Sequence, residues 1–77
     1  MYILEYSEQQ GQFHFNNGSM WPETFGWETV CRNLSYDQCL EFAELMRQKY
    51  SLIGGKTQSE NPSFELIKQE FVNFLLT

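Results

Sequence analysis

The stretch Tyr2–Asn16, YILEYSEQQGQFHFN, decides how the fold begins. Side chains alternate in character over residues 2–7 and again over residues 12–16, and a period of two is typical of strands with one buried face. Between the two runs lies Glu8–Gly11, a short polar segment whose glycine can adopt a positive φ angle. Two alternating runs joined by such a segment predict a β-hairpin.

A third strand is predicted over residues 27–32, with Trp27, Thr29 and Cys31 on one side. The apolar faces of the three strands can coincide, so that the sheet packs on the core through Tyr2, Leu4, Tyr6, Phe13, Phe15, Trp27 and Cys31. The other side would face water and carry Glu5, His14, Glu28 and Arg32, with Ile3 and Val30 as its apolar members. One packed face and one wet face are typical of an antiparallel meander.

A first helix is predicted over residues 36–50, because Ser35 and Gln38 have the spacing of a capping box. Its buried stripe is expected to contain Cys39, Phe42, Ala43, Met46 and Tyr50, widened by Tyr36 and Leu40. The outer face would carry an acidic row formed by Asp37, Glu41 and Glu44, with Gln48 beside it. Such a row is usually only a solvated surface, and its functional interpretation is a contact for a basic partner.

A second helix is predicted after Asn61 as N-cap and Pro62 as first helical residue. Its narrow apolar stripe would contain Phe64, Ile67, Phe71, Phe74 and Leu75. We expect this helix to pack on the core of its own chain, with packing on a second copy as the other possibility, so that the protein is a monomer or a weak homodimer. The glycine-rich residues 54–61 before it are predicted to be a flexible connector.

The predicted fold is therefore α+β, in the order β-β-β-α-α. A three-stranded antiparallel sheet, a hairpin plus a third strand, is packed on one face by the two C-terminal helices. The 77 residues are expected to form a single small domain, because one domain of this size leaves no room for a second core.

Composition excludes several classes of function. Ten acidic residues against five basic ones give a net charge of −5, which disfavours binding to a nucleic-acid backbone. The N-terminus does not have the pattern of a signal peptide, and no apolar run is long enough to span a membrane. We therefore expect a cytoplasmic protein in which Cys31 and Cys39 are reduced thiols.

Catalysis, metal binding and cofactor binding are not predicted. Cys31, Cys39 and His14 are the only soft metal ligands, and their spacing matches no structural zinc site. The strand alternation places Cys31 and His14 on opposite faces of the sheet, which argues against a Cys–His dyad. His14 is instead expected near Glu5, Glu28 or Arg32.

Residues 18–27, GSMWPETFGW, combine loop-forming residues with large apolar side chains. One interpretation is a lid in which Trp21 and Phe25 fold over the open end of the sheet. The other is a binding loop that presents Met20, Trp21 and Phe25 to a partner, since exposed tryptophan is common at binding hot spots. Trp27 is expected to be buried in either case.

The leading hypothesis is a small, bacterial-type accessory protein that binds another protein without catalysis. Its contacts would be the aromatic loop, the edge of the sheet or the acidic helix face. The alternative is a small-ligand-binding or regulatory domain, in which aromatic side chains wall a pocket between the sheet and the second helix.

Overall fold

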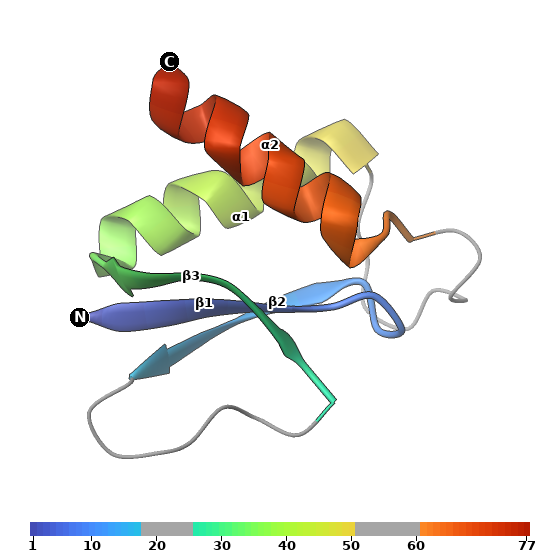
Figure 1. Cartoon of the computed structure of the whole chain (residues 1–77), viewed down its shortest axis with the longest axis horizontal. Helices are drawn as coiled ribbons and strands as arrows, with labels where there is room; N and C mark the ends of the chain where they lie inside the picture. Colours follow the sequence, from blue (N-terminus) through green and yellow to red (C-terminus); the bar gives the residue numbers. More distant parts are fainter. Residues whose placement is uncertain (18–25, 51–60) are drawn as a thin grey trace.

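The computed structural model describes residues 1–17, 26–50 and 61–77 (Figure 1). Within them the elements follow in the order β1 (Tyr2–Ser7), β2 (Gln12–Asn17), β3 (Glu28–Leu34), α1 (Tyr36–Tyr50) and α2 (Phe64–Leu76). The strands form one antiparallel sheet, and both helices lie on the same side of it. The predicted α+β architecture is confirmed. Most of the predicted connector and of the aromatic loop lies outside the described residues.

The strand order is β2-β1-β3, so the predicted meander, which would place β2 in the centre, is wrong. β1 pairs with β2 through the hairpin and with β3 on its other edge. Every residue of β1 after Tyr2 is buried, whereas Gln12, His14 and Asn17 of β2 are exposed. β1 has a strand at each edge, so side chains of both β2 and β3 can help to cover its two faces.

The side of the sheet away from the helices is less solvated than predicted. Ile3, Glu5 and Ser7 alternate with the core residues of β1 and therefore point to this side, yet all three are buried. Glu5 is 0% exposed. The prediction of a wet face is thus wrong for the central strand, and we call this side the Glu5 face.

β3 contains a bulge that overturns the predicted direction of its side chains. Leu4 pairs with Cys31 and Glu5 with Thr29, so Val30 is one extra residue in β3. One extra residue reverses which side every earlier side chain faces. Thr29 therefore lies on the Glu5 face instead of the core side, while Val30, expected on the wet side, is buried in the core.

Trp27 is affected by the same bulge. It precedes the first residue of β3 and is only half-buried, with its ring 5.8 Å from that of His14 on the Glu5 face. The prediction that Trp27 faces the core is wrong. A second irregularity in β3 lies near Asn33, which has a φ angle of 60°.

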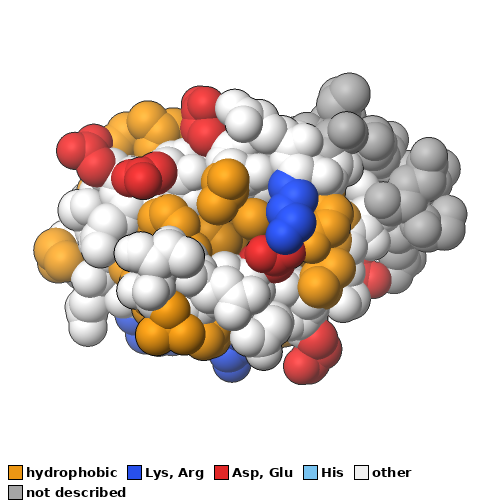
Figure 2. Space-filling model, turned by 90° about the horizontal axis from the view of Figure 1, so that it is seen from above, with side chains coloured by type: hydrophobic (Ala, Val, Ile, Leu, Met, Phe, Trp, Pro, Cys, Tyr) orange, Lys and Arg blue, Asp and Glu red, His pale blue; other side chains and the backbone are white. Residues whose placement is uncertain are grey.

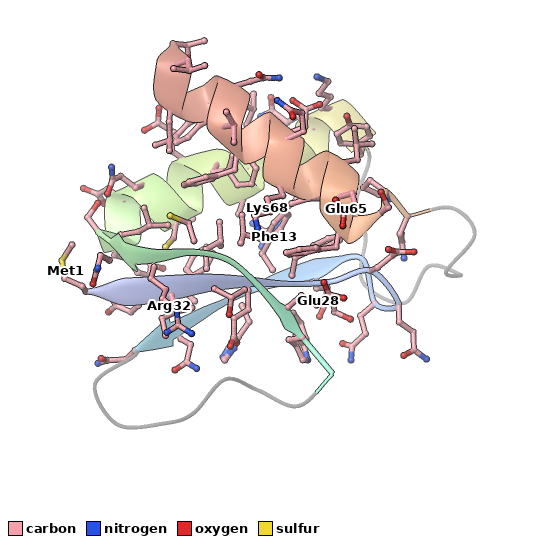
Figure 3. All side chains as sticks on the ribbon, viewed as in Figure 1. Met1, Phe13, Glu28, Arg32, Glu65 and Lys68 are labelled. Carbon is pink, nitrogen blue, oxygen red and sulfur yellow. The ribbon has the colours of Figure 1, made fainter. Side chains whose placement is uncertain are left out.

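The core lies between the sheet and the two helices, and Phe42 of α1 is at its centre. Its ring lies 5.8 Å from Phe13 of β2, 5.0 Å from Phe71 and 5.4 Å from Phe74 of α2. Figure 3 labels Phe13 at the point where the sheet meets the helices. Edge-to-face pairs of this kind stabilise by about 0.5–1.5 kcal/mol each beyond the area they bury.

The predicted apolar stripe of α1 is confirmed for Cys39, Phe42, Ala43 and Met46, which are buried, while Tyr50 is half-buried against the core. Tyr36, which was expected to widen the stripe, is exposed. α2 packs on the core of its own chain through Ile67 and Phe71. Leu75 was expected in the same stripe but is 55% exposed. The end of α2 rises away from the sheet, so its last turn has less core to cover (Figure 1).

The start of α2 differs from the prediction. Ser63 is the N-cap, and its hydroxyl accepts a hydrogen bond from the Leu66 N–H at 3.2 Å. Asn61 does not cap the helix. Its side-chain amide instead donates to the carbonyl of Glu8 in the hairpin turn, at 2.8 Å.

Two more hydrogen bonds join the entry of α2 to the hairpin. The hydroxyl of Tyr6 donates to the carbonyl of Pro62 at 2.7 Å, and the Phe64 N–H donates to the carboxylate of Glu8 at 3.1 Å. We call this set the α2 anchor, and it consists of Tyr6, Glu8, Asn61, Pro62 and Phe64. The anchor replaces the expected cap because the hairpin turn lies directly beside the start of the helix.

Gly11 in the hairpin turn is required for two reasons. Its φ angle is +64°, and a Cβ atom there would lie 2.6 Å from Oδ1 of Asn61. We expect Gly11→Ala to lower the free energy of unfolding by about 1–2 kcal/mol for the backbone angle alone, with the clash added to this. Urea unfolding in a double-mutant cycle with Asn61→Ala measures the clash. If the two costs are additive, Gly11 and Asn61 are not in contact.

Tyr6 makes stability depend on alkaline pH. Burial, and after it the charge of Glu8, raises the pKa of Tyr6 to about 12 from 10.0. The folded state therefore favours the neutral phenol, and this stabilisation is complete below pH 10 and is lost as the pH rises through 12. At most about 3 kcal/mol is involved. Urea unfolding as a function of pH should show a steeper loss for the wild type than for Tyr6→Phe. Parallel losses would contradict the assignment.

Candidate functional site

A shallow hollow on the outer face of α1 brings the predicted acidic residues together with apolar ones. It has a volume of about 550 Å³. Its lining residues are Asp37, Leu40, Glu41, Glu44, Leu45 and Gln48 of α1 and Phe74 of α2. We call it the acidic groove. All three residues of the predicted acidic face line it.

The acidic row owes its position to the way α1 begins. Both bonds of the predicted capping box are present: the Gln38 N–H donates to the hydroxyl of Ser35 at 3.1 Å, and the Ser35 N–H donates to the side chain of Gln38 at 3.0 Å. They fix the first turn, in which Asp37 lies. Steps of four and three residues then keep Glu41 and Glu44 on the same side of the helix.

The apolar part of the groove comes from Leu40, Leu45 and Phe74. Leu45 is 46% exposed, whereas Leu40 and Phe74 are half-buried. At 100° per residue, Leu40 and Leu45 lie on either side of the acidic row. Figure 2 shows apolar side chains exposed among acidic ones over the helices. A partner would therefore meet charge in the middle of the groove and apolar surface on both sides.

An ionic contact holds the two helices together away from the groove. The carboxylate of Glu70 in α2 accepts a hydrogen bond from the Tyr50 hydroxyl and lies 2.6 Å from Nζ of Lys49. The hydrogen bonds from Lys49 and Tyr50 lower the pKa of Glu70, and its carboxylate raises the pKa of both partners. Lys49 is thus occupied by Glu70, and no basic residue is among those that line the groove.

A second candidate is a polar row on the Glu5 face. Glu5 of β1 pairs in register with His14 of β2 and with Thr29 of β3. Nδ1 of His14 lies 2.8 Å from Oε1 of Glu5, and the side chain of His14 is 48% exposed. The hydroxyl of Thr29 is buried and has no hydrogen-bond partner within the described chain. His14 therefore lies beside Glu5, as expected, although the carboxylate is buried and not solvated.

The chemistry of the polar row is limited. The imidazole of His14 is engaged with the buried Glu5 through Nδ1. Cys31 faces the core on the opposite side of the sheet, through its pairing with Leu4. Burial raises the pKa of Cys39, which disfavours its thiolate. The row thus brings no thiol to the imidazole.

The remaining predicted sites are reported briefly. Met20, Trp21 and Phe25 lie outside the described residues. Over the ranges 1–17, 26–50 and 61–77, no three His, Cys, Asp or Glu side chains lie close enough to hold a metal ion. Neither α1 nor α2, the helices described, is long and apolar enough to cross a membrane. Cys31 and Cys39 are both free.

Comparison of the chain with protein-family models, with curated proteins and with solved structures finds no match. Function is therefore inferred from the chain's own residues. Sequence reasoning found the acidic row but missed Leu40, Leu45 and Phe74 as its neighbours. The signal for Leu45 was present, because it is a large apolar residue outside the buried stripe and next to Glu44.

The pair of His14 and Glu5 yields a stability prediction. His14→Ala leaves a buried carboxylate without this donor and should lower the free energy of unfolding by about 1.5–3 kcal/mol, the range for hydrogen bonds to charged groups. Urea unfolding at neutral pH measures this loss. In a Glu5→Gln background the same substitution should lower the free energy of unfolding by less, because the side chain at position 5 then has no charge that loses a hydrogen-bond donor. An equal cost in both backgrounds would show that the pairing is not what stabilises His14.

Proposed function

We propose that this protein is a non-catalytic, cytoplasmic accessory protein that binds another protein through the acidic groove. The observation that carries the proposal is the joint presence of three carboxylates and exposed apolar side chains in one hollow. Such a combination suits a partner segment with both basic and apolar residues. The monomer or weak homodimer expected from the sequence remains part of the proposal.

The charge of the groove is available to a partner. Asp37, Glu41 and Glu44 are exposed and form no ion pair within the described chain. Three carboxylates on one helix face repel phosphate and attract Lys or Arg, so a basic protein segment is favoured over nucleic acid. Because the groove is open to water, the charges contribute more to the rate and the specificity of association than to its strength.

The apolar neighbours supply the rest of the interaction. Leu45 is a large side chain that the fold leaves nearly half exposed on a helix face that is otherwise acidic or polar. Phe74 is half-buried and packs edge-to-face on Phe42 of the core. A partly exposed aromatic side chain that is packed on the core is typical of an anchor point at a protein interface.

The alternative hypothesis, a pocket between the sheet and α2, receives less support. Rings of Phe13, Phe42 and Phe71 lie at this place and pack against one another. Their edge-to-face contacts occupy the space in which a ligand would have to lie. By contrast, the groove on the outer face of α1 is open, which supports the hypothesis that the protein binds another protein. The aromatic loop with Trp21 stays a second proposed contact.

A test uses a library of random peptides selected on the immobilised wild type. The selected peptides are then measured on Leu45→Lys, which removes apolar surface and adds a repelling charge in the groove. Leu66→Lys is the matched control, because Leu66 of α2 is 41% exposed and lies outside the groove. We expect basic peptides that keep their affinity for the control and lose at least about tenfold on Leu45→Lys, or 1.4 kcal/mol.

Two outcomes would overturn the proposal. One is that selection recovers no peptide above background. The other is that the recovered peptides bind wild type, Leu45→Lys and Leu66→Lys with the same affinity, which would place the contact elsewhere on the protein.

A further inference from the structure

We infer that the segment bound in the acidic groove is an amphipathic α-helix whose basic residues recur at steps of four and three. This inference rests on the proposed function and adds the conformation and residue pattern of the partner. It is carried by three features of the groove: the helical walls, the spacing of the carboxylates and the positions of the leucines.

The backbone of the groove walls offers no unpaired N–H or C=O groups to a partner's backbone. All lining residues belong to α1 or α2, within which N–H and C=O groups are paired along the helix. An extended peptide gains affinity by adding to the edge of a sheet, where backbone groups are unpaired. In this groove an extended backbone would find no row of unpaired N–H and C=O groups, only the side chains of the lining residues. A helix satisfies its own backbone and avoids this cost.

The spacing of the carboxylates points the same way. Asp37 and Glu41 are four residues apart and Glu41 and Glu44 three, which corresponds to rises of about 6 and 4.5 Å along α1. A second helix alongside α1 presents residues at the same steps of four and three and can match each carboxylate with a basic side chain. In a strand, side chains on one face recur at every second residue, about 6.6 Å apart. This spacing does not match the shorter rise between Glu41 and Glu44.

The leucines define where the partner's apolar residues lie. Leu40 and Leu45 flank the acidic row on the helical wheel, and Phe74 joins the lining from α2. A helix with a basic row in the middle and leucines beside it would set its own apolar side chains on these three residues. Two helices in such contact have their axes 8–10 Å apart, a distance set by side chains of this size.

The experiment compares three synthetic peptides of equal length, about 15–20 residues so that a helix can form. The first has Lys at steps of four and three with Leu beside the basic row. The second has the same residues rearranged with a period of two, as in a strand. The third is the first with a central proline, which breaks the helix. Titration is followed by NMR of the protein and by circular dichroism of the peptide.

We expect the helical peptide to bind at least about tenfold more tightly than either of the other two and to gain helicity on binding. Its affinity should fall with salt and on Glu41→Gln/Glu44→Gln. The control is Glu28→Gln/Glu65→Gln, which removes the same charge at exposed positions outside the groove and should leave affinity unchanged. Figure 3 labels Glu28 and Glu65, on β3 and in the first turn of α2.

The other outcomes separate the inference from the proposed function. If the strand-period or proline peptide binds as well as the helical one and depends on Glu41 and Glu44, the groove binds protein but not as a helix. If none of the three binds while the random library yields groove-dependent peptides, the inference fails and the function stands. If the library also yields none, both fail. Helical binding that ignores Glu41→Gln/Glu44→Gln overturns the inference too.

Discussion

Burial of β1 on both faces is the constraint on which the rest of the structure depends. β1 has Leu4 and Tyr6 buried on one side and Ile3 and a fully buried Glu5 on the other, and it has a neighbouring strand at each edge. β2 supplies one through the hairpin, and β3 supplies the second. The helices then cover the Leu4 side, with Phe42 at the centre of the aromatic contacts. This arrangement leaves the outer face of α1 exposed.

The position of the helices also explains why the acidic groove exists. Cys39, Phe42, Ala43 and Met46 turn one face of α1 to the core, so the acidic row lies on the opposite face of the helix, where its residues are exposed. α2 crosses close enough for Phe74 to contribute to the lining, and Glu70 contacts Lys49 and Tyr50 between the same two helices. The groove is therefore a consequence of the same packing that forms the core.

Local patterns predicted the elements well, because each depends on residues close in sequence. The hairpin and α1 with its capping box follow from the alternation and from Ser35 and Gln38. The errors all involve contacts between distant residues. One extra residue at Val30 reverses the direction of Thr29 and Trp27, and alternation alone does not reveal a bulge. Asn61 was a reasonable N-cap in isolation, but the hairpin turn offered its amide a carbonyl of Glu8.

The candidate site likewise has features that could be predicted from the sequence and features that could not. The acidic row was predictable from steps of four and three within one helix, whereas Phe74 joins it only through the placement of α2. The pairing of His14 with Glu5 was among the expected neighbours because both lie in one hairpin. The burial of Glu5 was not predictable, since it follows from the central place of β1 in the sheet.

The α2 anchor has a consequence for the kinetics of folding. Its hydrogen bonds join residues 53 to 56 positions apart, so forming any of them closes a loop that contains most of the chain. Contacts of such long range are made late, because the entropy of closing the intervening loop precedes their gain. Interactions that are absent from the transition state act on the rate of unfolding and leave the rate of folding nearly unchanged. The anchor therefore governs the lifetime of the folded state more than the speed at which it forms.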